Sequence, residues 1–491
     1  MLSFFTAVFY GVVVALLFSL AIFIHEFGHY LAARWLGLKI DAFSIGFGPA
    51  IWKKTVNGIE YKICCIPFGG YVALPQLDPS GMQKIQGDNS GGEDENGEPL
   101  PDIAPWKRIL VAFAGPLGNV VLAVFLAFLL FLVPAARMNV TGTEVGSVLR
   151  SSKAYERGLR VGDRIETVNG VSVETWSDLR VESMLAGDQE TGLFGIVRPD
   201  GTRTTLELPF TTNNVFGVKM LGGVAPLGKC VVTNVLAGSV AEKAGLRPDD
   251  ELVTLNGQSV GSTWHFIERM VENGVNPVTL GVLRGREKLT FEVTPVMDQE
   301  AKRPLIGVML DDPSEQVMSW MMYRNPWKQL KWDSLSVVRV LKALVTPRAK
   351  GERKAVAKNI GGPVTIVVGL YRSAKGSMWD GLGFLRMICM NLAILNLLPL
   401  PVLDGGHILF ALYEILFRRK PHPKFVSIVT NFFAFLLIGL MLFLVFRDVL
   451  LQRRIIKAEK ALEEKLSDSN EAGQGSATNQ APASAVPAQG K

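Results

Sequence analysis

Two histidines one helical turn apart lie at the end of a long apolar segment near the amino terminus. They belong to the sequence His25-Glu26-Phe27-Gly28-His29, an H-E-x-x-H pattern. On a helix, positions 25 and 29 share one face, so both imidazoles can bind the same metal ion. Glu26 lies beside them, where its carboxylate can take a proton from water. The pattern predicts a zinc site for hydrolysis, with His25 and His29 as ligands and Glu26 as the catalytic acid/base.

The segment before this pattern has the composition of a membrane-spanning helix. It contains no charged residue from Phe4 to Ile24, and about 20 apolar residues cross a bilayer. An ionisable side chain at that depth costs roughly 2.5–3.5 kcal/mol, so three neighbouring ionisable groups need a partner such as Zn²⁺. Because H-E-x-x-H alone also occurs by chance in long chains, the rest of the chain has to supply the context.

A second polar cluster interrupts an apolar segment late in the chain, from Asn396 to His407. Its sequence is N-L-L-P-L-P-V-L-D-G-G-H. The prolines remove backbone donors, so the helix must unwind there, which a membrane tolerates where the backbone is buried or lines a cavity. Asp404 can complete a two-histidine, one-carboxylate set that leaves a fourth zinc position for water. His407 and Glu414 are rival third ligands, and an exposed turn is the alternative interpretation of Asp404.

Composition and hydropathy indicate a membrane protein. The chain has 491 residues, is 48% hydrophobic and carries a net charge of only +6 without a block of basic and aromatic residues, so we expect no nucleic-acid binding. Basic residues in the 31–108 loop and the 418–424 connection place both on the cytoplasmic side, although basic residues after 446 disagree. We expect a polytopic α-helical membrane protein with about four transmembrane helices, at 4–30, 109–133, 382–402 and 425–446.

The region between the second and third spans repeats itself. The stretch 158–170 recurs as 245–257, whereas Trp176 recurs as Trp264, one residue out of step, which indicates a single insertion. The period and the β-rich pattern predict two homologous α+β domains. They resemble tandem PDZ domains, which bind carboxyl-terminal or extended peptides; a purely steric role is the alternative.

The remaining stretches complete the predicted domain organisation. Asn57-Gly58 marks a β-hairpin within residues 41–74, interpreted either as a small sheet or as an edge strand that receives an extended substrate. The predicted divisions are 1–135 for two spans, the hairpin and a disordered acidic insertion (78–104); 136–224 and 225–300 for the first and second PDZ domains; 301–380 for an interfacial amphipathic helical region; 381–450 for the last two spans; and 451–491 for a polar, largely disordered tail.

Together these motifs resemble the bacterial site-2 proteases of the regulator-of-sigma-E type over most of the chain. H-E-x-x-H is followed by Gly115-Pro116-Leu117-Gly118-Asn119, similar to the family's G-x-x-x-N, by the tandem domains, and by N-x-x-P-x-P-x-L-D-G from Asn396. The resemblance implies an intramembrane zinc metalloprotease of the bacterial inner membrane, with a membrane-associated β-hairpin and periplasmic PDZ domains. The residues implied are the Zn²⁺ ligands His25, His29 and Asp404, catalytic Glu26, and the substrate-binding Asn396, Asn119 and Gly115.

The resemblance also implies the partners. They are single-pass membrane proteins, such as an anti-sigma factor already shortened by another protease in an extracytoplasmic stress response, and remnant signal peptides. Peptide ligands of the PDZ domains are further expected partners. A non-catalytic scaffold that binds periplasmic peptides is an alternative function. A transporter is another, although repetition occurs only outside the spans.

Overall fold

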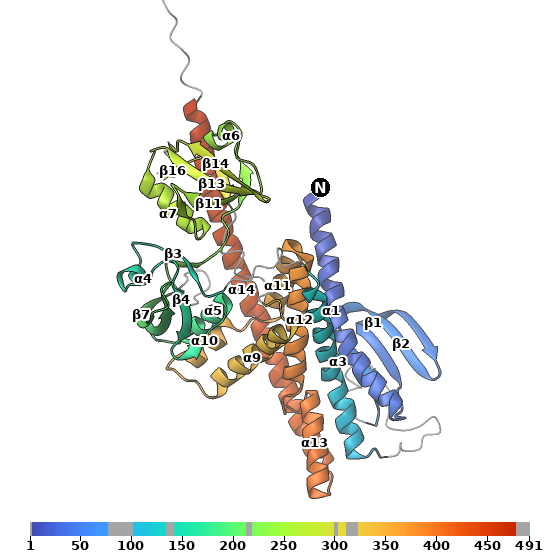
Figure 1. Ribbon diagram of the computed structural model, residues 1–491. Coiled ribbons are helices and arrows are strands. Elements are labelled where there is room, and N and C mark those ends of the chain that lie inside the picture. Colours follow the sequence, from blue (N-terminus) through green and yellow to red (C-terminus); the bar gives the residue numbers. More distant parts are fainter. Residues whose placement is uncertain are drawn as a thin grey trace, which may run out of the picture. The chain divides into compact units, whose positions relative to one another are not determined.

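The computed structural model describes residues 2–76, 102–133, 142–212, 219–298, 303–310 and 323–477 (Figure 1). The chain forms two compact units. The membrane unit comprises residues 1–140, 319–348 and 356–448, and the β-rich unit comprises residues 141–318, 349–355 and 449–491. Most of the acidic insertion predicted at 78–104 lies outside the described residues.

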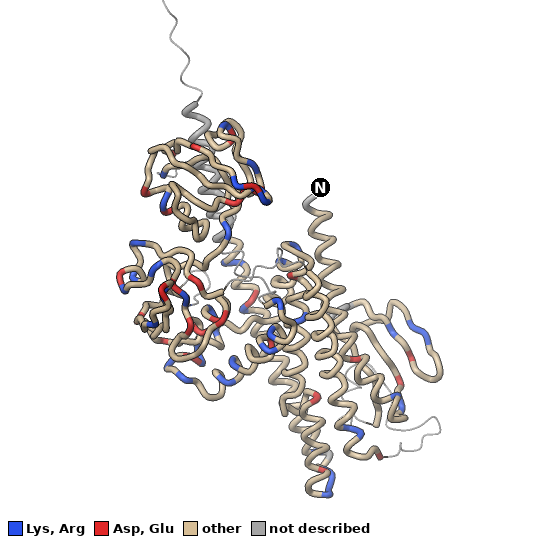
Figure 2. The backbone as a smooth tube through the Cα atoms, in the orientation of Figure 1, with Lys and Arg blue, Asp and Glu red and all other residues tan. Residues whose placement is uncertain are grey.

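Four helices of the described chain are long and apolar enough to cross a membrane. This confirms the prediction of a membrane protein with about four spans. In Figure 2 the first two of these helices are drawn almost entirely without charged residues. The helices are α1 (Leu2–Trp35), α3 (Pro105–Phe131), α12 (Met378–Asn396) and α14 (Pro423–Ala477).

Helix α3 is the central helix of the membrane unit, because α1, α12 and α13 (Asp404–Phe417) all pack against it. Small residues permit this packing: Ala21, Ala123 and Cys389 are completely buried in the shared core. Arg386 of α12 is also buried, and its Nε lies 2.7 Å from Oδ2 of Asp333 on α9 (Pro326–Val345). This buried ion pair compensates the one basic charge of α12.

The third span is interrupted where the sequence requires it. The predicted helix over 382–402 instead begins at Met378 and ends at Asn396. Residues 397–403, which include Pro399 and Pro401, are irregular, and α13 starts at Asp404. The boundary prediction was wrong at both ends, but the expected unwinding at the prolines is present, because proline cannot supply the backbone N–H that a continuous helix needs.

Strands β1 (Ala42–Val56) and β2 (Ile59–Ala73) form the predicted hairpin around Asn57-Gly58. Both turn residues have positive φ, 52° and 77°, as a two-residue hairpin turn demands. The strands are long and irregular, so residues 42–45 pair both with 60–63 and with 70–73. The pairing order is therefore 52–56, 59–63, 42–45 and 70–73, and β2 packs on α1 (Figure 1).

The β-rich unit contains the predicted repeat. β4 begins at Arg164 and β11 at Glu251, 87 residues apart, and β6 and β13 at Thr191 and Val278 keep this spacing. The predicted insertion is wrong: α5 and α7 also start 87 residues apart, and the tryptophans occupy different sites, since Trp176 is 6% exposed and Trp264 is 46% exposed.

Each domain is closed by its last strand. In the first β domain (145–226) β9 pairs with the opening strand β3, and in the second β domain (232–310) β17 pairs with β10. The predicted boundaries at 224 and 300 are therefore too early, because the closing strands are short and have no distinctive pattern. The elements are β3 (Val145–Val148), α4 (Lys153–Glu156), β4 (Arg164–Val168), β5 (Val171–Ser172), α5 (Trp176–Leu185), β6 (Thr191–Val197), β7 (Arg203–Thr212), β8 (Lys219–Leu221) and β9 (Val224–Pro226), then β10 (Val232–Val235), α6 (Val240–Ala244), β11 (Glu251–Leu255), β12 (Gln258–Ser259), α7 (Thr263–Asn273), β13 (Val278–Arg284), β14 (Glu287–Val293), β15 (Val296–Asp298), β16 (Arg303–Leu305) and β17 (Val308–Leu310).

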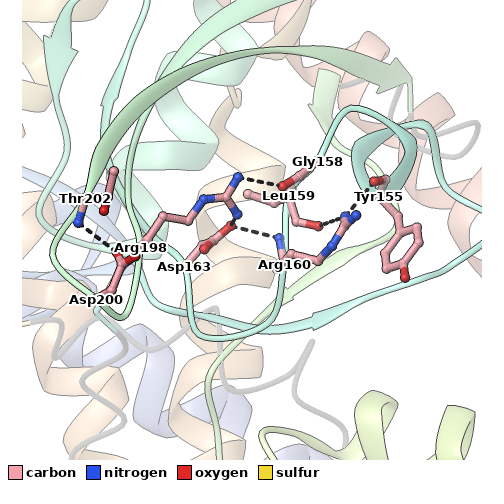
Figure 3. Close-up of polar contacts among 8 residues, drawn as sticks. All are labelled: Tyr155, Gly158, Leu159, Arg160, Asp163, Arg198, Asp200 and Thr202. Carbon is pink, nitrogen blue, oxygen red and sulfur yellow. Dashed lines mark hydrogen bonds and ion pairs between the residues drawn. The ribbon is translucent and has the colours of Figure 1, made fainter.

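A buried carboxylate stabilises the same loop in both domains. In the first, Asp163 accepts hydrogen bonds from the Arg160 backbone and from Arg198, at 2.8 and 2.7 Å (Figure 3). In the second, Asp250 has the equivalent partners, including Arg284 at 2.7 Å. Burial acts to raise the pKa of Asp250, but the Arg284 guanidinium and a backbone N–H outweigh it and hold the pKa below its usual value.

The carboxyl-terminal prediction needs one correction. Helix α14 continues to Ala477, whereas residues 451–491 were expected to be largely disordered; those after 477 lie outside the described residues. The stretch 451–466 is rich in Lys, Glu, Ala and Leu, which favour helix. Between α9 and α12 the chain forms α10 (Glu352–Asn359) and α11 (Pro363–Gly376).

Candidate metal centre

Three helices of the membrane unit carry polar residues to one place. α1 supplies His25, Glu26 and His29 from its last turns, α13 supplies Asp404 as its first residue, and α12 ends at Asn396. In the part of the chain that the structure describes, His25, His29 and Asp404 form the single group of at least three potential ligands close enough to hold a metal ion, with ligand atoms within 4.8 Å of one another.

The spacing of these ligand atoms fits zinc. His25 Nε2 lies 3.2 Å from His29 Nε2 and 3.3 Å from Asp404 Oδ2, and His29 Nε2 lies 3.4 Å from Asp404 Oδ1. Around tetrahedral zinc, with bonds of about 2.0–2.1 Å, ligand atoms are about 3.3 Å apart. Asp404 Oδ2 is buried and receives no hydrogen bond from the described residues, so a cation would satisfy it.

His29 is held with its metal-binding nitrogen toward this space. Its Nδ1 lies 2.8 Å from the carbonyl oxygen of Val111 in α3. A carbonyl only accepts hydrogen bonds, so Nδ1 carries the proton and Nε2 keeps its lone pair. This partner fixes the tautomer and orients the ring, as the outer partners of metal-binding histidines generally do.

Glycines allow α1 and α3 to approach closely beside the imidazoles. A Cβ atom at Gly115 would lie 2.2 Å from His29 Nε2, and one at Gly28 would lie 2.2 Å from the α3 backbone. A Cβ atom at Gly118 would lie 2.6 Å from the α1 backbone. Such contacts are possible only without side chains, which is the usual way in which small residues bring membrane helices together.

The Asp404 side of the site depends on two further glycines. A Cβ atom at Gly405 would lie 2.2 Å from the carbonyl oxygen of Leu398, and one at Gly406 would lie 2.3 Å from that of Leu400. The start of α13 therefore packs directly on the irregular segment that precedes it. This contact fixes the position of Asp404 at the helix start.

Glu26 lies next to the ligands and beside the edge of the sheet. It is partly buried, and a Cβ atom at Gly70 would lie 3.2 Å from its Cγ. Residues 70–73 form an outer segment of the sheet, paired on one side with residues 42–45. The Glu26 side chain and an edge strand are thus adjacent.

The structure brings all three residues predicted to bind substrate to the imidazoles. Asn396 Nδ2 lies 3.4 Å from His25 Nε2. Asn119, by contrast, is 0% exposed, with its Nδ2 3.3 Å from His25 Nδ1, and Gly115 packs on His29. The assignment of these residues to substrate binding stays a prediction.

The rival third ligands are placed elsewhere. His407 is exposed, and Glu414 forms an ion pair with Arg108 at 2.9 Å. Neither belongs to the group of potential metal ligands.

Two contributions to the site that the sequence did not predict come from the backbone. The glycine at position 28, inside H-E-x-x-H, indicates that another helix can pack closely there, but the sequence does not specify which helix. The Val111 carbonyl carries no sequence signal, because every residue type has the same carbonyl group.

Four apolar helices and a histidine–histidine–aspartate site next to a glutamate define the class as a membrane-embedded metallopeptidase. The chain belongs to peptidase family M50, whose family model matches residues 13–440. This confirms the resemblance stated from the motifs.

Two named bacterial proteins are similar to most of the chain. The chain is 30% identical over 455 residues to the regulator of sigma E protease of Salmonella typhimurium, covering 86% of this chain and 94% of the relative. It is 30% identical over 455 residues to a candidate zinc metalloprotease of Xylella fastidiosa, covering 88% and 97%. Among solved structures, 16% of the chain is similar to 85% of a PDZ domain chain from Listeria monocytogenes, at 20% identity and a TM-score of 0.16.

Proposed function

We propose that this protein is an intramembrane zinc endopeptidase that hydrolyses peptide bonds in or near the transmembrane helix of membrane-anchored substrates. The proposal rests on the three distances among the ligand atoms of His25, His29 and Asp404, which are 3.2, 3.3 and 3.4 Å. These residues lie beside Glu26 and between helices apolar enough to cross a membrane. His25, His29 and Asp404 would hold the ion and leave one position open, as catalytic zinc sites do.

Zinc held there would polarise the scissile carbonyl and lower the pKa of water to about 7. Glu26 takes the proton of the attacking water and later gives it to the leaving amine. The Asn396 amide, next to the ligand atoms, is placed to donate a hydrogen bond to a substrate carbonyl.

A transmembrane substrate must unwind before it can be cut, because its carbonyls are bonded within its own helix. The segment 70–73 offers replacement partners, since it lies at the sheet edge and beside Glu26. An extended substrate pairing with this edge would present its backbone to the site by strand addition. This favours the second of the two interpretations of the hairpin.

The proposed orientation places the site near the cytoplasmic side of the bacterial inner membrane. Two contacts between the end of the 31–108 loop and the region of the 418–424 connection support this: Lys420 pairs with Asp102, and Arg108 with Glu414. Basic residues in short loops favour the cytoplasm. The two β domains would then be periplasmic PDZ domains that exclude substrates with bulky outer domains.

The substrate class follows from this arrangement. A single-pass protein whose periplasmic domain has already been removed would reach the site, such as a shortened membrane-bound anti-sigma factor or a remnant signal peptide. The proposed role in an extracytoplasmic stress response rests on the first of these substrates.

Cleavage of a tagged single-span substrate by the purified full-length protein tests the proposal. Wild type should cleave it and lose cleavage with a chelator, whereas Glu26→Gln should retain zinc and lose cleavage by at least 100-fold, on the order of the general-base contribution. Glu287→Gln, the same exchange at an exposed strand residue, should cleave normally. Equal cleavage by Glu26→Gln and wild type would refute the protease and favour the scaffold.

A further inference from the structure

Asn119 lies behind His25 in the core of the membrane unit. It is 0% exposed, and its Nδ2 lies 3.3 Å from His25 Nδ1. Its Oδ1 is also buried, and no described residue donates a hydrogen bond to it. The oxygen and nitrogen of an asparagine amide have nearly the same shape, so the hydrogen-bond network has to decide which is which.

Metal binding fixes where the His25 proton must be. A neutral imidazole has one N–H, and the nitrogen that faces the other ligand atoms is Nε2. If Nε2 gives its lone pair to the metal, the proton is on Nδ1, which then requires an acceptor. If the amide N–H₂ of Asn119 faced a protonated Nδ1, two hydrogen-bond donors would meet and no hydrogen bond would form. Turning the Asn119 amide by 180° places Oδ1 against Nδ1–H and gives the buried oxygen its donor.

His29 provides the comparison within the same site. Its Nδ1 also faces α3, and there the partner is the Val111 carbonyl, which is an acceptor in any orientation. Val111 and Asn119 lie two turns apart on α3, so both face α1. One helix would therefore supply an acceptor to each of the two imidazoles.

We propose that Asn119 is a positioning residue: its Oδ1 accepts a hydrogen bond from His25 Nδ1–H and so keeps the His25 Nε2 lone pair toward the metal. The inference rests on the proposed function, because it takes His25 as a zinc ligand. Asn119 acts through His25 and touches neither substrate nor ion. By orienting His25, Asn119 raises the affinity of the site for zinc.

The test is the zinc affinity of the purified full-length protein in detergent, measured by competition with a chromophoric chelator. Asn119→Leu keeps a branched side chain but removes the acceptor, and it should weaken zinc binding by about 10–100-fold, the usual effect of losing such a partner. Asn119→Asp keeps an acceptor and has no donor when ionised, so its affinity should remain close to that of wild type. The thermal unfolding temperature of each zinc-free variant shows that it is folded, and Asn119→Ala replaces the leucine variant if leucine does not fit.

A matched control is Asn431→Leu, the same exchange at an exposed position of the spanning helix α14, which should bind zinc like wild type. The inference is overturned if Asn119→Asp loses as much affinity as Asn119→Leu, because the amide would then act as a donor or by packing. It is also overturned if the leucine and alanine variants keep wild-type affinity. In both cases the proposed function would still hold if the wild-type protein binds zinc and its cleavage depends on Glu26. A wild-type protein without zinc affinity would refute both the role of Asn119 and the proposed function.

Discussion

Alanine in place of Gly115 should disable the metal site without unfolding α3. The added Cβ atom would lie 2.2 Å from His29 Nε2, and an ordinary contact begins at 3.4 Å, so the two groups must separate by about 1.2 Å. α3 cannot simply retreat, because Val111 on the same helix holds His29 by the 2.8 Å hydrogen bond. A misplacement of about 1 Å at a catalytic centre costs on the order of 100-fold in rate, while the local overpacking costs about 1–3 kcal/mol.

The assay combines zinc content with cleavage of a single-span substrate. Gly115→Ala should lose at least on the order of 100-fold in cleavage and bind zinc more weakly, yet remain folded. Gly439→Ala is the control, since nothing lies within 4 Å of a Cβ atom at that position of α14, and alanine favours helix by about 1 kcal/mol over glycine. If Gly115→Ala cleaves as fast as Gly439→Ala, the close approach of α3 to the imidazoles is not what the site requires.

Three further predictions address the ligand set, the buried ion pair and the β-rich unit. Asp404→Ala should abolish stoichiometric zinc binding, measured by metal analysis, whereas Glu414→Ala should retain it; the reverse result would assign the third ligand to Glu414. Arg386→Met leaves a buried carboxylate unpaired and should cost about 3–5 kcal/mol, visible as a lower thermal unfolding temperature of the detergent-solubilised protein. Because the pKa of Asp250 is lowered in the folded state, its stabilising effect is complete above the ordinary pKa of about 3.9 and is lost as the pH falls through the lower folded value. Arg284→Gln should shift that loss to higher pH, and hydrogen exchange of residues 232–310 in the full chain would detect it; unchanged exchange would contradict the assignment.

The chemistry of the site was largely predictable, because its residue types are rare in apolar segments. His25, Glu26 and His29 share a helix turn, and Asp404 stood out as an acid among apolar residues. What the sequence did not predict depends on contacts between distant segments. The division of two long strands into a sheet with the order 52–56, 59–63, 42–45 and 70–73 is one case, because no local pattern specifies that residues 42–45 pair with a segment on each side. The role of Asn119 is another, since a polar residue in a span suits a substrate as well as an imidazole until its burial is known.

The site is built where the spanning helices depart from regularity, and this follows from what hydrolysis inside lipid requires. Pro116 leaves α3 without the backbone N–H that would bond to the Ala112 carbonyl, and the Val111 carbonyl of the preceding residue bonds to His29. Pro399 and Pro401 end α12, so that Asp404 begins a new helix at the ligand atoms. Continuous helices would engage their backbone groups internally and offer only side chains to the ion and the substrate. The interruption before α13 instead places a carboxylate at a helix start, and the glycines on both sides of it allow the close packing on which the site depends.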